Sequence, residues 1–539
     1  MKKKFLVTCA LPYANGSMHI GHMFEHIQAD IWVRHQRMLG HQVWFICSDD
    51  AHGTAIMIQA KKMSITPKQL INTFFQEHKN DLKSFNILYD YYSSTHSNKN
   101  KYFVKKIYYT LQLKQLIKQK NILQLYDVKE KIFLPDRFVK GICPICYVNN
   151  QYGDNCESCG SIYKAIELIR PLSNLSGTVP IIRSSNHLFF NLNRFKQSLH
   201  VWINSGVLQK QILNKTKEWF NLGLKQWNIS RDAPYFGFKI PNTHEKYFYV
   251  WLDAIICYIS TFKELCDKSN FLDFYEFWNI DSQIKLYHFI GKDIIYFHTL
   301  FWPAILEAVN FRKPNKIFVH GYVTWNGTKL SKSRSSLILV KKWFQYLGSD
   351  SLRYYYASKL SSNIDDIEIN FQELINKINS DLVNKIVNLA SRSSSFLKNY
   401  FDNILSLELD DKQLYQIFID SSKMISSFFK KREFNLVIKH LVKLSNLANQ
   451  YIDNQKPWRM SVIDNYVKLH NVCSMGVQLF YVIMIFIKPI LPDLAKKTEL
   501  FLMKKLCWSD IHKPLLGHRI NLFYPLYNKI ELNVIKKFF

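Results

Sequence analysis

The first fifty residues follow a strand–helix–strand pattern. Residues 5–10 are largely apolar and predict a buried strand, and a helical periodicity that includes Met23 and Ile27 then runs to Gly40. Residues 42–47 predict a second buried strand. These three elements form a βαβ unit, so we expect an α/β fold in which the N-terminal domain is a doubly wound, parallel sheet of Rossmann type.

The regular pattern is lost in the middle of the chain and then returns. Residues 116–227 have no steady periodicity and carry a cysteine cluster among turn residues. Strand-like runs follow at residues 247–250, 286–290 and 317–320. We therefore expect an inserted domain that splits the sheet domain into two halves.

Helical periodicity dominates the last third of the chain. Beyond Asp350, apolar residues recur at helical spacing, as at Leu382, Ile386 and Leu389, and few strand signals remain. This region is expected to be an α-helical bundle. The whole pattern predicts five segments: residues 1–115 and 229–335 as the two halves of the sheet domain, 116–228 as the insertion, 336–385 as a linker region, and 386–539 as the helical domain.

Two apolar stretches could be interpreted as a targeting segment or a membrane span. The basic start of the chain leads into a short apolar run and then a loop at residues 12–16, which is not the pattern of a signal peptide. Residues 477–487 are strongly apolar but fall short of the roughly 20 residues that span a bilayer. We expect a buried helix there and no membrane partner.

The composition and net charge of the chain indicate a polyanionic binding partner. Apolar residues make up 47% and charged residues 21%, as in a soluble globular protein. The 71 Lys and Arg outnumber the 42 Asp and Glu and give a formal charge of +29, which favours binding to nucleic acid. An AT-rich coding sequence also enriches lysine, so only part of this charge is attributed to binding.

Four of the ten cysteines lie within seventeen residues of one another. Cys143, Cys146, Cys156 and Cys159 form two CxxC pairs, a spacing typical of a closed tetrahedral zinc site. A disulfide pair or a remnant without metal is the alternative. Four thiolates leave no open position, so one structural Zn²⁺ is expected, and the remaining scattered cysteines suit a reducing cytoplasm.

A histidine pair marks the entrance of the first predicted helix. His19 and His22 are three residues apart and flank Gly21, where the helix begins after the first strand. Free N–H groups at a helix N-terminus bind phosphate, and glycine allows close approach of a nucleotide. On this pattern alone, two buried core histidines remain an equally simple interpretation.

A lysine-rich segment follows the last predicted strand. Lys329 and Lys332 lie in a short KLSKS run, which alone would be interpreted as a solvated loop. Both segments, however, follow parallel strands, and ligands bind at that edge of such sheets. Together they resemble the HIGH and KMSKS signatures of class I aminoacyl-tRNA synthetases, with Leu330 in place of the usual methionine.

Longer matches resemble one family of these enzymes, the methionyl-tRNA synthetases. They cover nearly the whole chain and comprise residues 8–16 (TCALPYANG), 48–54 (SDDAHGT), 133–138 (FLPDRF), 229–237 (ISRDAPYFG) and 289–293 (FIGKD). The resemblance implies that the chain activates L-methionine with ATP and Mg²⁺ and transfers it to elongator and initiator tRNA(Met). It also implies that residues 336–385 contact the tRNA stem.

The resemblance assigns site residues position by position. It implies that His19, His22 and Lys332 are catalytic, and that ATP is bound by His19, Gly21, His22, Lys329 and Lys332. It implies a methionine pocket of Leu11, Tyr13, Asp50, Trp251, Ala254, Tyr258, Ile294 and His298. It further implies that Asn388, Arg392 and Trp458 bind the anticodon.

Some positions depart from the family, and rival functions remain to be weighed. Ile255 and Cys257 replace the family's Pro and Gly, and Trp325 is bulkier than usual. Synthetases for Leu, Ile or Val share both signatures but need a large editing domain, for which this length leaves no room. A nucleotidyltransferase or a catalytically inactive RNA-binding protein fits less of the pattern. Some members dimerise through an extra C-terminal domain, whose absence here predicts a monomer.

Overall fold

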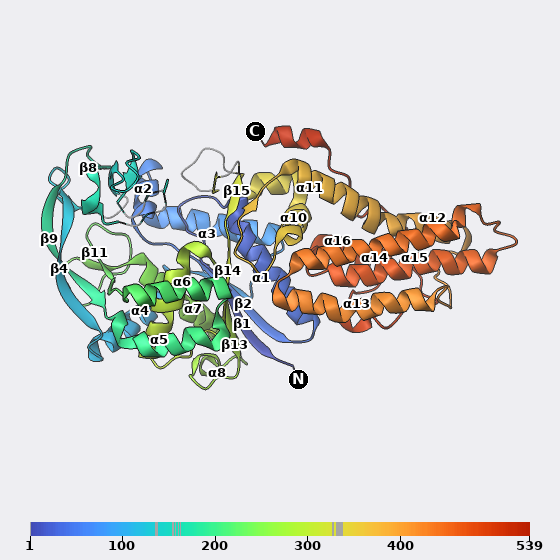
Figure 1. Ribbon diagram of the computed structural model, residues 1–539, viewed down its shortest axis with the longest axis horizontal. Coiled ribbons are helices and arrows are strands. Elements are labelled where there is room, and N and C mark those ends of the chain that lie inside the picture. The colour runs from blue at the N-terminus through green and yellow to red at the C-terminus, as the bar shows by residue number, and fades with distance from the viewer. Residues whose placement is uncertain are drawn as a thin grey trace.

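The molecule is elongated, with an α/β part at one end and a helical bundle at the other (Figure 1). The computed structural model describes residues 2–134, 138–153, 156, 158–159, 161, 163–325, 328–329 and 338–538. The expected class, a mixed α/β fold with a parallel sheet, a cysteine-containing insertion and a helical C-terminal region, is confirmed.

The α/β part is built on a five-stranded sheet in the order β14-β13-β1-β2-β3, in which every neighbouring pair is parallel. Its strands are β1 (Lys4–Cys9), β2 (Gln42–Asp49), β3 (Tyr91–Ser94), β13 (Lys285–Gly291) and β14 (Lys316–His320). The chain leaves β1 toward β2 on one side and returns to β13 on the other. The strand order therefore reverses between β1 and β13, and ligands bind beyond the carboxyl ends of the strands at such a point.

Helices cover both faces of this sheet. Phe5 and Val7 of β1 belong to one core together with α1 (Ile20–Met38), whereas Leu6 belongs to a second core together with α7 (Val250–Asp267). Successive side chains of a strand point to opposite faces, so α1 and α7 lie on opposite faces. The other helices of this part are α2 (Thr54–Lys62), α3 (Pro67–Ser84), α4 (Asn98–Leu113), α8 (Phe274–Trp278) and α9 (Trp302–Ala308).

Two elements of the sheet domain differ from expectation. The edge strand β3 was not predicted, because its Tyr-Tyr-Ser-Ser sequence carries little apolar signal. Residues 247–250 do not join the parallel sheet. β12 (Lys246–Phe248) instead pairs antiparallel with β11 (Ser230–Asp232), and Val250 begins α7. A short aromatic and β-branched run does not distinguish a strand from the start of a buried helix.

The insertion forms the end of the molecule farthest from the bundle (Figure 1). One antiparallel sheet contains β4 (Ile117–Asp127), β5 (Ile132–Phe133), β9 (Ile181–Phe190) and β10 (Trp227–Asn228). A smaller sheet of β6 (Val139–Ile142), β7 (Gln151–Tyr152) and β8 (Ile169–Ser173) lies beside the four cysteines. α5 (Lys196–Trp202) and α6 (Lys210–Leu222) complete this segment.

The C-terminal region is a helical bundle, as expected. It contains α10 (Val340–Lys359), α11 (Phe371–Lys377), α12 (Asn388–Tyr400), α13 (Lys412–Lys431), α14 (Phe434–Gln455), α15 (Tyr466–Ile487) and α16 (Pro492–Leu502). α15 has 22 residues and is apolar enough to cross a membrane by length and composition, so the argument that it is too short was wrong. The expected burial holds, since 89% of its most apolar window is buried inside the protein.

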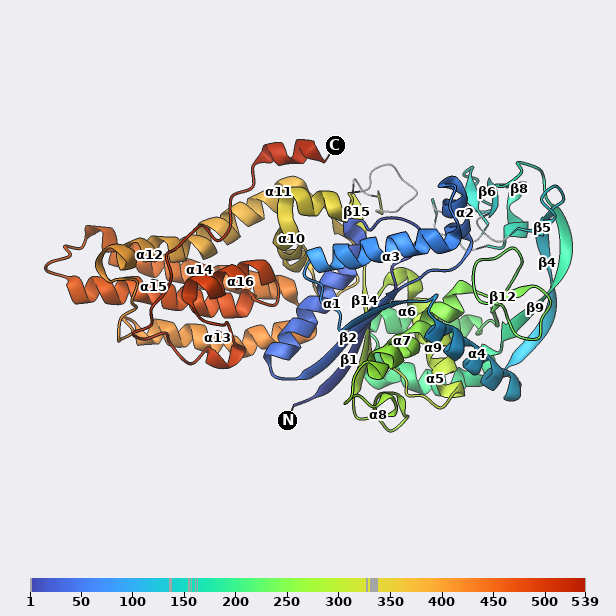
Figure 2. The ribbon, with the colours of Figure 1, turned by 180° about the vertical axis from the view of Figure 1, so that it is seen from behind.

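One helix, α1, joins the two parts of the molecule, and it lies between the sheet and the bundle in both views (Figures 1 and 2). Near its middle, Asp30 accepts a hydrogen bond of 2.7 Å from the fully buried Arg353 of α10. Arg353 also donates to the Ile490 carbonyl at 2.7 Å. At the far end of α1, the buried His35 ring stacks on Phe429 of α13 with 4.5 Å between centroids. Removing one partner of a buried ion pair costs about 3–5 kcal/mol, so this junction is firmly held.

Candidate functional site

A cavity of about 320 Å³ opens at the carboxyl edge of the sheet, beside the point where the strand order reverses. Its walls come from the segments that follow β1, β2 and β13 and from the start of α7. All eight residues assigned by resemblance to the amino-acid pocket line it: Leu11, Tyr13, Asp50, Trp251, Ala254, Tyr258, Ile294 and His298. Residues up to 287 positions apart in sequence therefore converge on one cavity, from Leu11 to His298.

Much of the lining of this cavity is aromatic and uncharged. Trp251 packs against Phe297 with ring centroids 3.9 Å apart. His298 Nδ1 lies 3.0 Å from the Ile294 carbonyl, which can only accept, so Nδ1 carries the hydrogen and Nε2 accepts the Tyr258 hydroxyl at 3.0 Å. Burial lowers the pKa of His298 to about 4, so the ring is neutral at pH 7. Such a wall suits an uncharged, polarizable side chain.

The acidic group of the cavity is Asp50, directly after β2. Its backbone N–H donates to the Pro12 carbonyl at 2.9 Å, and its own carbonyl accepts from Ala14 at 2.8 Å. Its Oδ1 atom is buried and has no hydrogen-bond partner in the part of the chain that the structure describes. Burial, and next the charge of Asp253, raise the pKa of Asp50 well above its ordinary value. A cation in the cavity would relieve both effects.

The predicted histidine pair lies at the start of α1. His19 is the N-cap residue and is buried, and its backbone N–H donates to His22 Nδ1 at 3.1 Å. The two imidazole rings are 3.7 Å apart. Gly21 is the second residue of the helix. The pair and the glycine thus surround a helix N-terminus, where phosphate oxygens find N–H donors.

The residues directly before α10, which follow the lysine segment in sequence, pair with the residues around the histidine pair through the backbone. Lys332 lies outside the described residues. Lys329 forms β16 (Thr328–Lys329) with its backbone, paired with β15 (Val323–Trp325). On the other side of the segment, Ile20 donates to the Ile338 carbonyl at 3.0 Å, and Val340 donates to the Met18 carbonyl at 3.1 Å. The segment that precedes α10 is therefore paired with the residues around His19.

A second, shallow cavity of about 380 Å³ lies on the helical bundle, and Asn388 and Arg392 of α12 line it. Arg392 forms an ion pair of 2.5 Å with Asp453 of α14. Its guanidinium lies 5.1 Å from the centre of the Trp458 ring, and that ring is 49% exposed. The three residues assigned to the anticodon therefore combine an amide, a cation and an exposed aromatic face.

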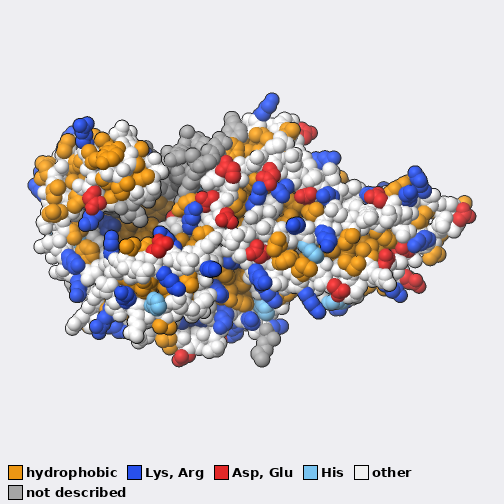
Figure 3. Space-filling model, in the orientation of Figure 1, with side chains coloured by type: hydrophobic (Ala, Val, Ile, Leu, Met, Phe, Trp, Pro, Cys, Tyr) orange, Lys and Arg blue, Asp and Glu red, His pale blue; other side chains and the backbone are white. Residues whose placement is uncertain are grey.

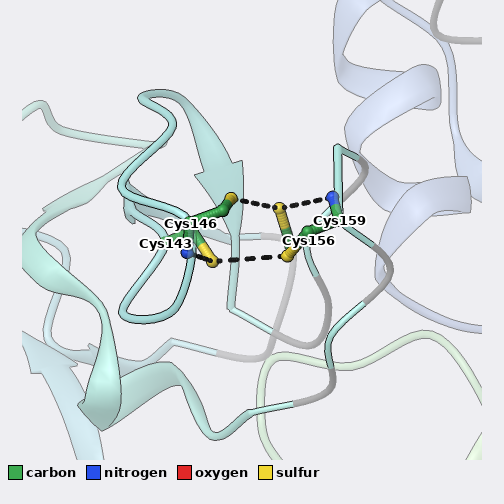
Figure 4. Close-up of side chains that lie close together, drawn as sticks. All are labelled: Cys143, Cys146, Cys156 and Cys159. Carbon is green, nitrogen blue, oxygen red and sulfur yellow. Dashed lines mark hydrogen bonds between the residues drawn. The ribbon is translucent and has the colours of Figure 1, made fainter.

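The sulfur atoms of the four cysteines in the insertion lie close to one another (Figure 4). The four Sγ atoms lie within 4.8 Å of one another, with Cys143 to Cys159 at 3.9 Å and Cys146 to Cys156 at 3.5 Å. A tetrahedral ion with metal–sulfur bonds of about 2.3 Å needs sulfur atoms about 3.8 Å apart. All ten cysteines of the chain are free thiols. The cluster can therefore hold a metal ion.

Backbone groups are arranged to favour thiolates in this cluster. The Cys146 N–H donates to Cys143 Sγ at 3.4 Å, and the Cys159 N–H donates to Cys156 Sγ at 3.3 Å. The hydroxyl and then the backbone amide of Ser161 lower the pKa of Cys159 to about 6. Thiolates are the form in which cysteine binds metal.

Comparison with known proteins places these sites in a family. The sequence model described as tRNA synthetases class I (M) matches residues 5–394. A methionine–tRNA ligase of Buchnera aphidicola from Acyrthosiphon pisum (strain Tuc7) is 58% identical over 537 residues, which cover 99% of this chain and 98% of the relative. That of Buchnera aphidicola from Schizaphis graminum is 59% identical over 529 residues, 98% of this chain and 97% of the relative.

The chain belongs to the methionyl-tRNA synthetases. It is thus a class I aminoacyl-tRNA synthetase, a ligase of translation. Solved structures support the fold. Methionyl-tRNA synthetase of Mycobacterium tuberculosis in complex with methionyl-adenylate superposes with a TM-score of 0.79 at 21% identity and covers 98% of this chain and 100% of that chain. The free form of the same enzyme gives a TM-score of 0.74 at 19% identity, with 98% and 99% covered.

The structure adds cavity residues of this synthetase that sequence reasoning did not select. Arg231 lines the cavity, and its guanidinium lies 3.8 Å from the centre of the Tyr249 ring. Tyr235 and Phe297 also line it. Arg231 and Tyr235 fall within residues 229–237, which resemble the family. This resemblance was the sequence signal that could have identified both residues.

The three departures from the family lie in different environments. Ile255 lines the cavity, so it contributes to the shape of the pocket of the synthetase. Cys257 is buried and contacts the Thr261 hydroxyl at 3.4 Å, and it is not among the lining residues. Trp325 packs edge-on against Phe371 of α11 at 5.3 Å, which anchors the end of β15.

Proposed function

We propose that the protein activates L-methionine with ATP and transfers it to the 3′ end of tRNA(Met), both elongator and initiator. The observation that carries this proposal is one cavity lined both by Asp50, whose buried Oδ1 has no hydrogen-bond partner among the described residues, and by aromatic side chains such as Trp251 and Tyr258. An α-ammonium pairs with the carboxylate, and a thioether packs against the aromatic rings. Family membership supports the same activity.

Adenylate formation needs positioning and charge stabilisation rather than a protein nucleophile. The methionine carboxylate attacks the α-phosphate of ATP, and pyrophosphate leaves. In this proposal His19, Gly21 and His22 bind ATP at the start of α1, and Mg²⁺ accompanies the phosphates. Lys329 and Lys332 bind the phosphates, and His19, His22 and Lys332 stabilise the developing charge.

The second step transfers the methionyl group to the terminal ribose of the tRNA. We assign Asn388, Arg392 and Trp458 to anticodon bases, because unpaired bases are bound by hydrogen bonds and aromatic stacking. Lys and Arg side chains are spread over both the α/β part and the bundle on the face drawn in Figure 3. A ligand as large as tRNA can meet positive charge along the whole molecule.

Amino-acid-dependent exchange of pyrophosphate into ATP tests the proposal. With each of the twenty amino acids supplied in turn, methionine should support exchange far better than the others, and purified tRNA(Met) should then be charged. Exchange with a different amino acid, or none with methionine, would contradict the proposed function.

Methionine binding should weaken as the pH falls. The pKa of Asp50 is raised by burial and by Asp253, so its carboxyl becomes neutral at a higher pH than an ordinary aspartate. The ion pair with the α-ammonium is therefore present above this raised pKa and is lost below it. As the pH is lowered from 8 to 5, the calorimetric Kd for methionine should rise for the native protein and stay nearly constant for Asp50→Asn. The same pH dependence of Kd in both proteins would exclude Asp50 as the cause.

We propose that the four cysteines hold one structural Zn²⁺. The sulfur separations and four-thiolate set fit tetrahedral zinc, with no open position for catalysis. When bound, the ion cross-links Cys143 and Cys146 beside β6 to Cys156 and Cys159. This link holds the small sheet of the insertion together.

Loss of one ligand should remove the metal and loosen the insertion. Cys156→Ser is expected to lower the zinc content from one ion per chain to well below one, and to lower the thermal transition by several degrees. Cys507→Ser, at an exposed cysteine outside the cluster, is the matched control and should change neither quantity. Full zinc content in the Cys156→Ser protein would show that the cluster is not the zinc site.

Two further expectations about the cellular state are part of this proposal. Ten free cysteines suit a reducing compartment, so we propose that the protein acts in the cytoplasm. We also propose that it acts as a monomer, since a net charge of +29 opposes self-association at modest ionic strength. Sedimentation equilibrium should return the single-chain mass of 64.0 kDa.

A further inference from the structure

A buried histidine of α3, His78, connects two segments of the catalytic domain. Its ring is fully buried, and both of its nitrogens are within hydrogen-bonding distance of oxygen atoms. Nδ1 lies 2.9 Å from Asp49 Oδ1, at the end of β2. Nε2 lies 3.0 Å from the carbonyl oxygen of Gly16, in the loop that leads to α1.

The partners of this ring determine where its hydrogens are. A carbonyl oxygen can only accept, so Nε2 must carry a hydrogen to bond Gly16. Asp49 Oδ1 also accepts the hydroxyl of Tyr92, and as an ionised carboxylate it can only accept, so with Asp49 ionised Nδ1 carries a hydrogen as well. An imidazole with hydrogens on both nitrogens is a cation. The geometry thus describes a buried His78 imidazolium paired with the Asp49 carboxylate.

The charged and titratable groups around this pair, among the described residues, are compatible with a cation. Burial, and next the positive charge of His78, lower the pKa of His26 on α1 to about 3, so His26 is neutral. Asp81, on α3 itself, has its pKa raised to about 6, chiefly by burial and next by Glu77, while His78 and Lys341 of α10 lower it. Asp49 and Tyr92 face the ring from β2 and β3.

Gly16 lies between other backbone attachments of the loop that leads to α1. Upstream, Ala14 donates to the Asp50 carbonyl at 2.8 Å. Downstream, Ile20 donates to the Ile338 carbonyl at 3.0 Å. Gly16 itself is three residues before His19, so its position affects where the histidine pair points. The bond from His78 holds this loop at a point between Ala14 and the start of α1.

We propose that His78 is a positioning residue of the ATP site, whose imidazolium holds the Gly16 carbonyl and thereby fixes the loop that leads to His19 and His22. This inference rests on the proposed function, because it takes ATP as the ligand of the histidine pair. His78 does not touch the reacting atoms. It transmits the rigidity of β2, through Asp49, to the entrance of α1.

Two neutral substitutions separate the two bonds of His78. The amide of asparagine places its donor near Nδ1 and keeps the bond to Asp49 but loses that to Gly16. The longer glutamine places its donor near Nε2 and keeps the bond to Gly16. Displacement by about 1 Å can cost up to about 100-fold in rate, so His78→Asn should raise the KM for ATP in pyrophosphate exchange about tenfold or more and lower kcat. His78→Gln should lie within about threefold of the native protein.

Methionine binding and thermal unfolding distinguish a positioning role of His78 from a general packing role. The Kd for methionine should stay within about twofold in both variants, and both should keep cooperative thermal unfolding. Equal ATP kinetics in His78→Asn and His78→Gln would overturn the role of the Gly16 bond. Loss of methionine and ATP binding together would show a general packing role and would also overturn it.

Nuclear magnetic resonance tests the protonation state without reference to activity. In histidine-labelled native protein at pH 7, the His78 ring should show two directly bonded N–H groups, assigned by their disappearance in His78→Gln. A single N–H group would overturn the imidazolium. If the native protein shows no methionine-dependent exchange, the proposed function fails by itself, and the ring still reports whether the buried cation exists.

Discussion

Replacing Asp50 with asparagine should lower kcat/KM for methionine in pyrophosphate exchange about 10²- to 10³-fold. Asparagine keeps the size of the side chain but removes the negative charge that faces the cavity. Truncating one partner of a buried, hydrogen-bonded charge pair costs about 2–5 kcal/mol, or about 30- to 5000-fold, and the expected loss lies within these limits. The KM for ATP should change little, because Asp50 is assigned to the α-ammonium and not to the phosphates.

A substrate without the ammonium group isolates this contact. 4-(Methylthio)butanoate has the side chain and carboxylate of methionine but no amine, so the native protein should bind it much more weakly than methionine. Asp50→Asn should bind both compounds with similar, weak affinity. If the substitution weakened the two compounds by the same factor, Asp50 would be maintaining the cavity rather than recognising the amine.

Replacing Trp458 with alanine should lower kcat/KM for tRNA(Met) about 5- to 150-fold and leave pyrophosphate exchange unchanged. Stacking of one base on an aromatic ring is worth about 1–3 kcal/mol, which gives this range. The residue is exposed and lies on the bundle beside Arg392, and it is not among the residues that line the cavity proposed for methionine. Its loss should therefore not affect the chemistry of activation.

Two controls decide whether stacking is the cause. Trp458→Phe keeps an aromatic face and should recover most of the charging rate. Tyr524→Ala removes another exposed ring, which, unlike that of Trp458, has no cation–π contact with Arg392 among the described residues, and should have little effect. A fall in exchange that matched the fall in charging would identify Trp458 as a residue needed for folding.

Much of this architecture follows from sequence patterns, because they reflect burial. The apolar run of β1 and the periodicity of α1 predicted both elements to within two residues. The position of the cavity could be anticipated as well, since the segment with the histidine pair follows β1 and ligands bind beyond the carboxyl ends of such strands. Which residues form its walls came from the family resemblance, because sites such as Leu11 and His298 meet only in the folded chain.

Other features could not be predicted, for physical reasons. The strand β3 is short, polar and at the edge of the sheet, so burial leaves almost no pattern in its sequence. The length of α15 was underestimated because its first turns are more polar than its centre. The bond between His78 and Gly16 joins residues 62 positions apart, and a lone histidine on a helix gives no sign of its partners. The loop that contains Lys332 lies outside the described residues, so its assigned role stays a prediction.

Because α1 runs without a break from the histidine pair to the bundle, the number of residues in this helix is fixed even where its side chains can change. The helix begins at the histidine pair, bonds Arg353 through Asp30, and ends against Phe429 with His35. Each residue of an α-helix advances the chain by about 1.5 Å and turns it by about 100°. If the contacts of Asp30 and His35 with the bundle stayed in place, inserting or deleting one residue between His22 and Asp30 would rotate the histidine pair by more than a quarter turn. The pair would then point away from the nucleotide. Natural variation in this helix should consist of exchanges of side chains, with the register between the two domains preserved.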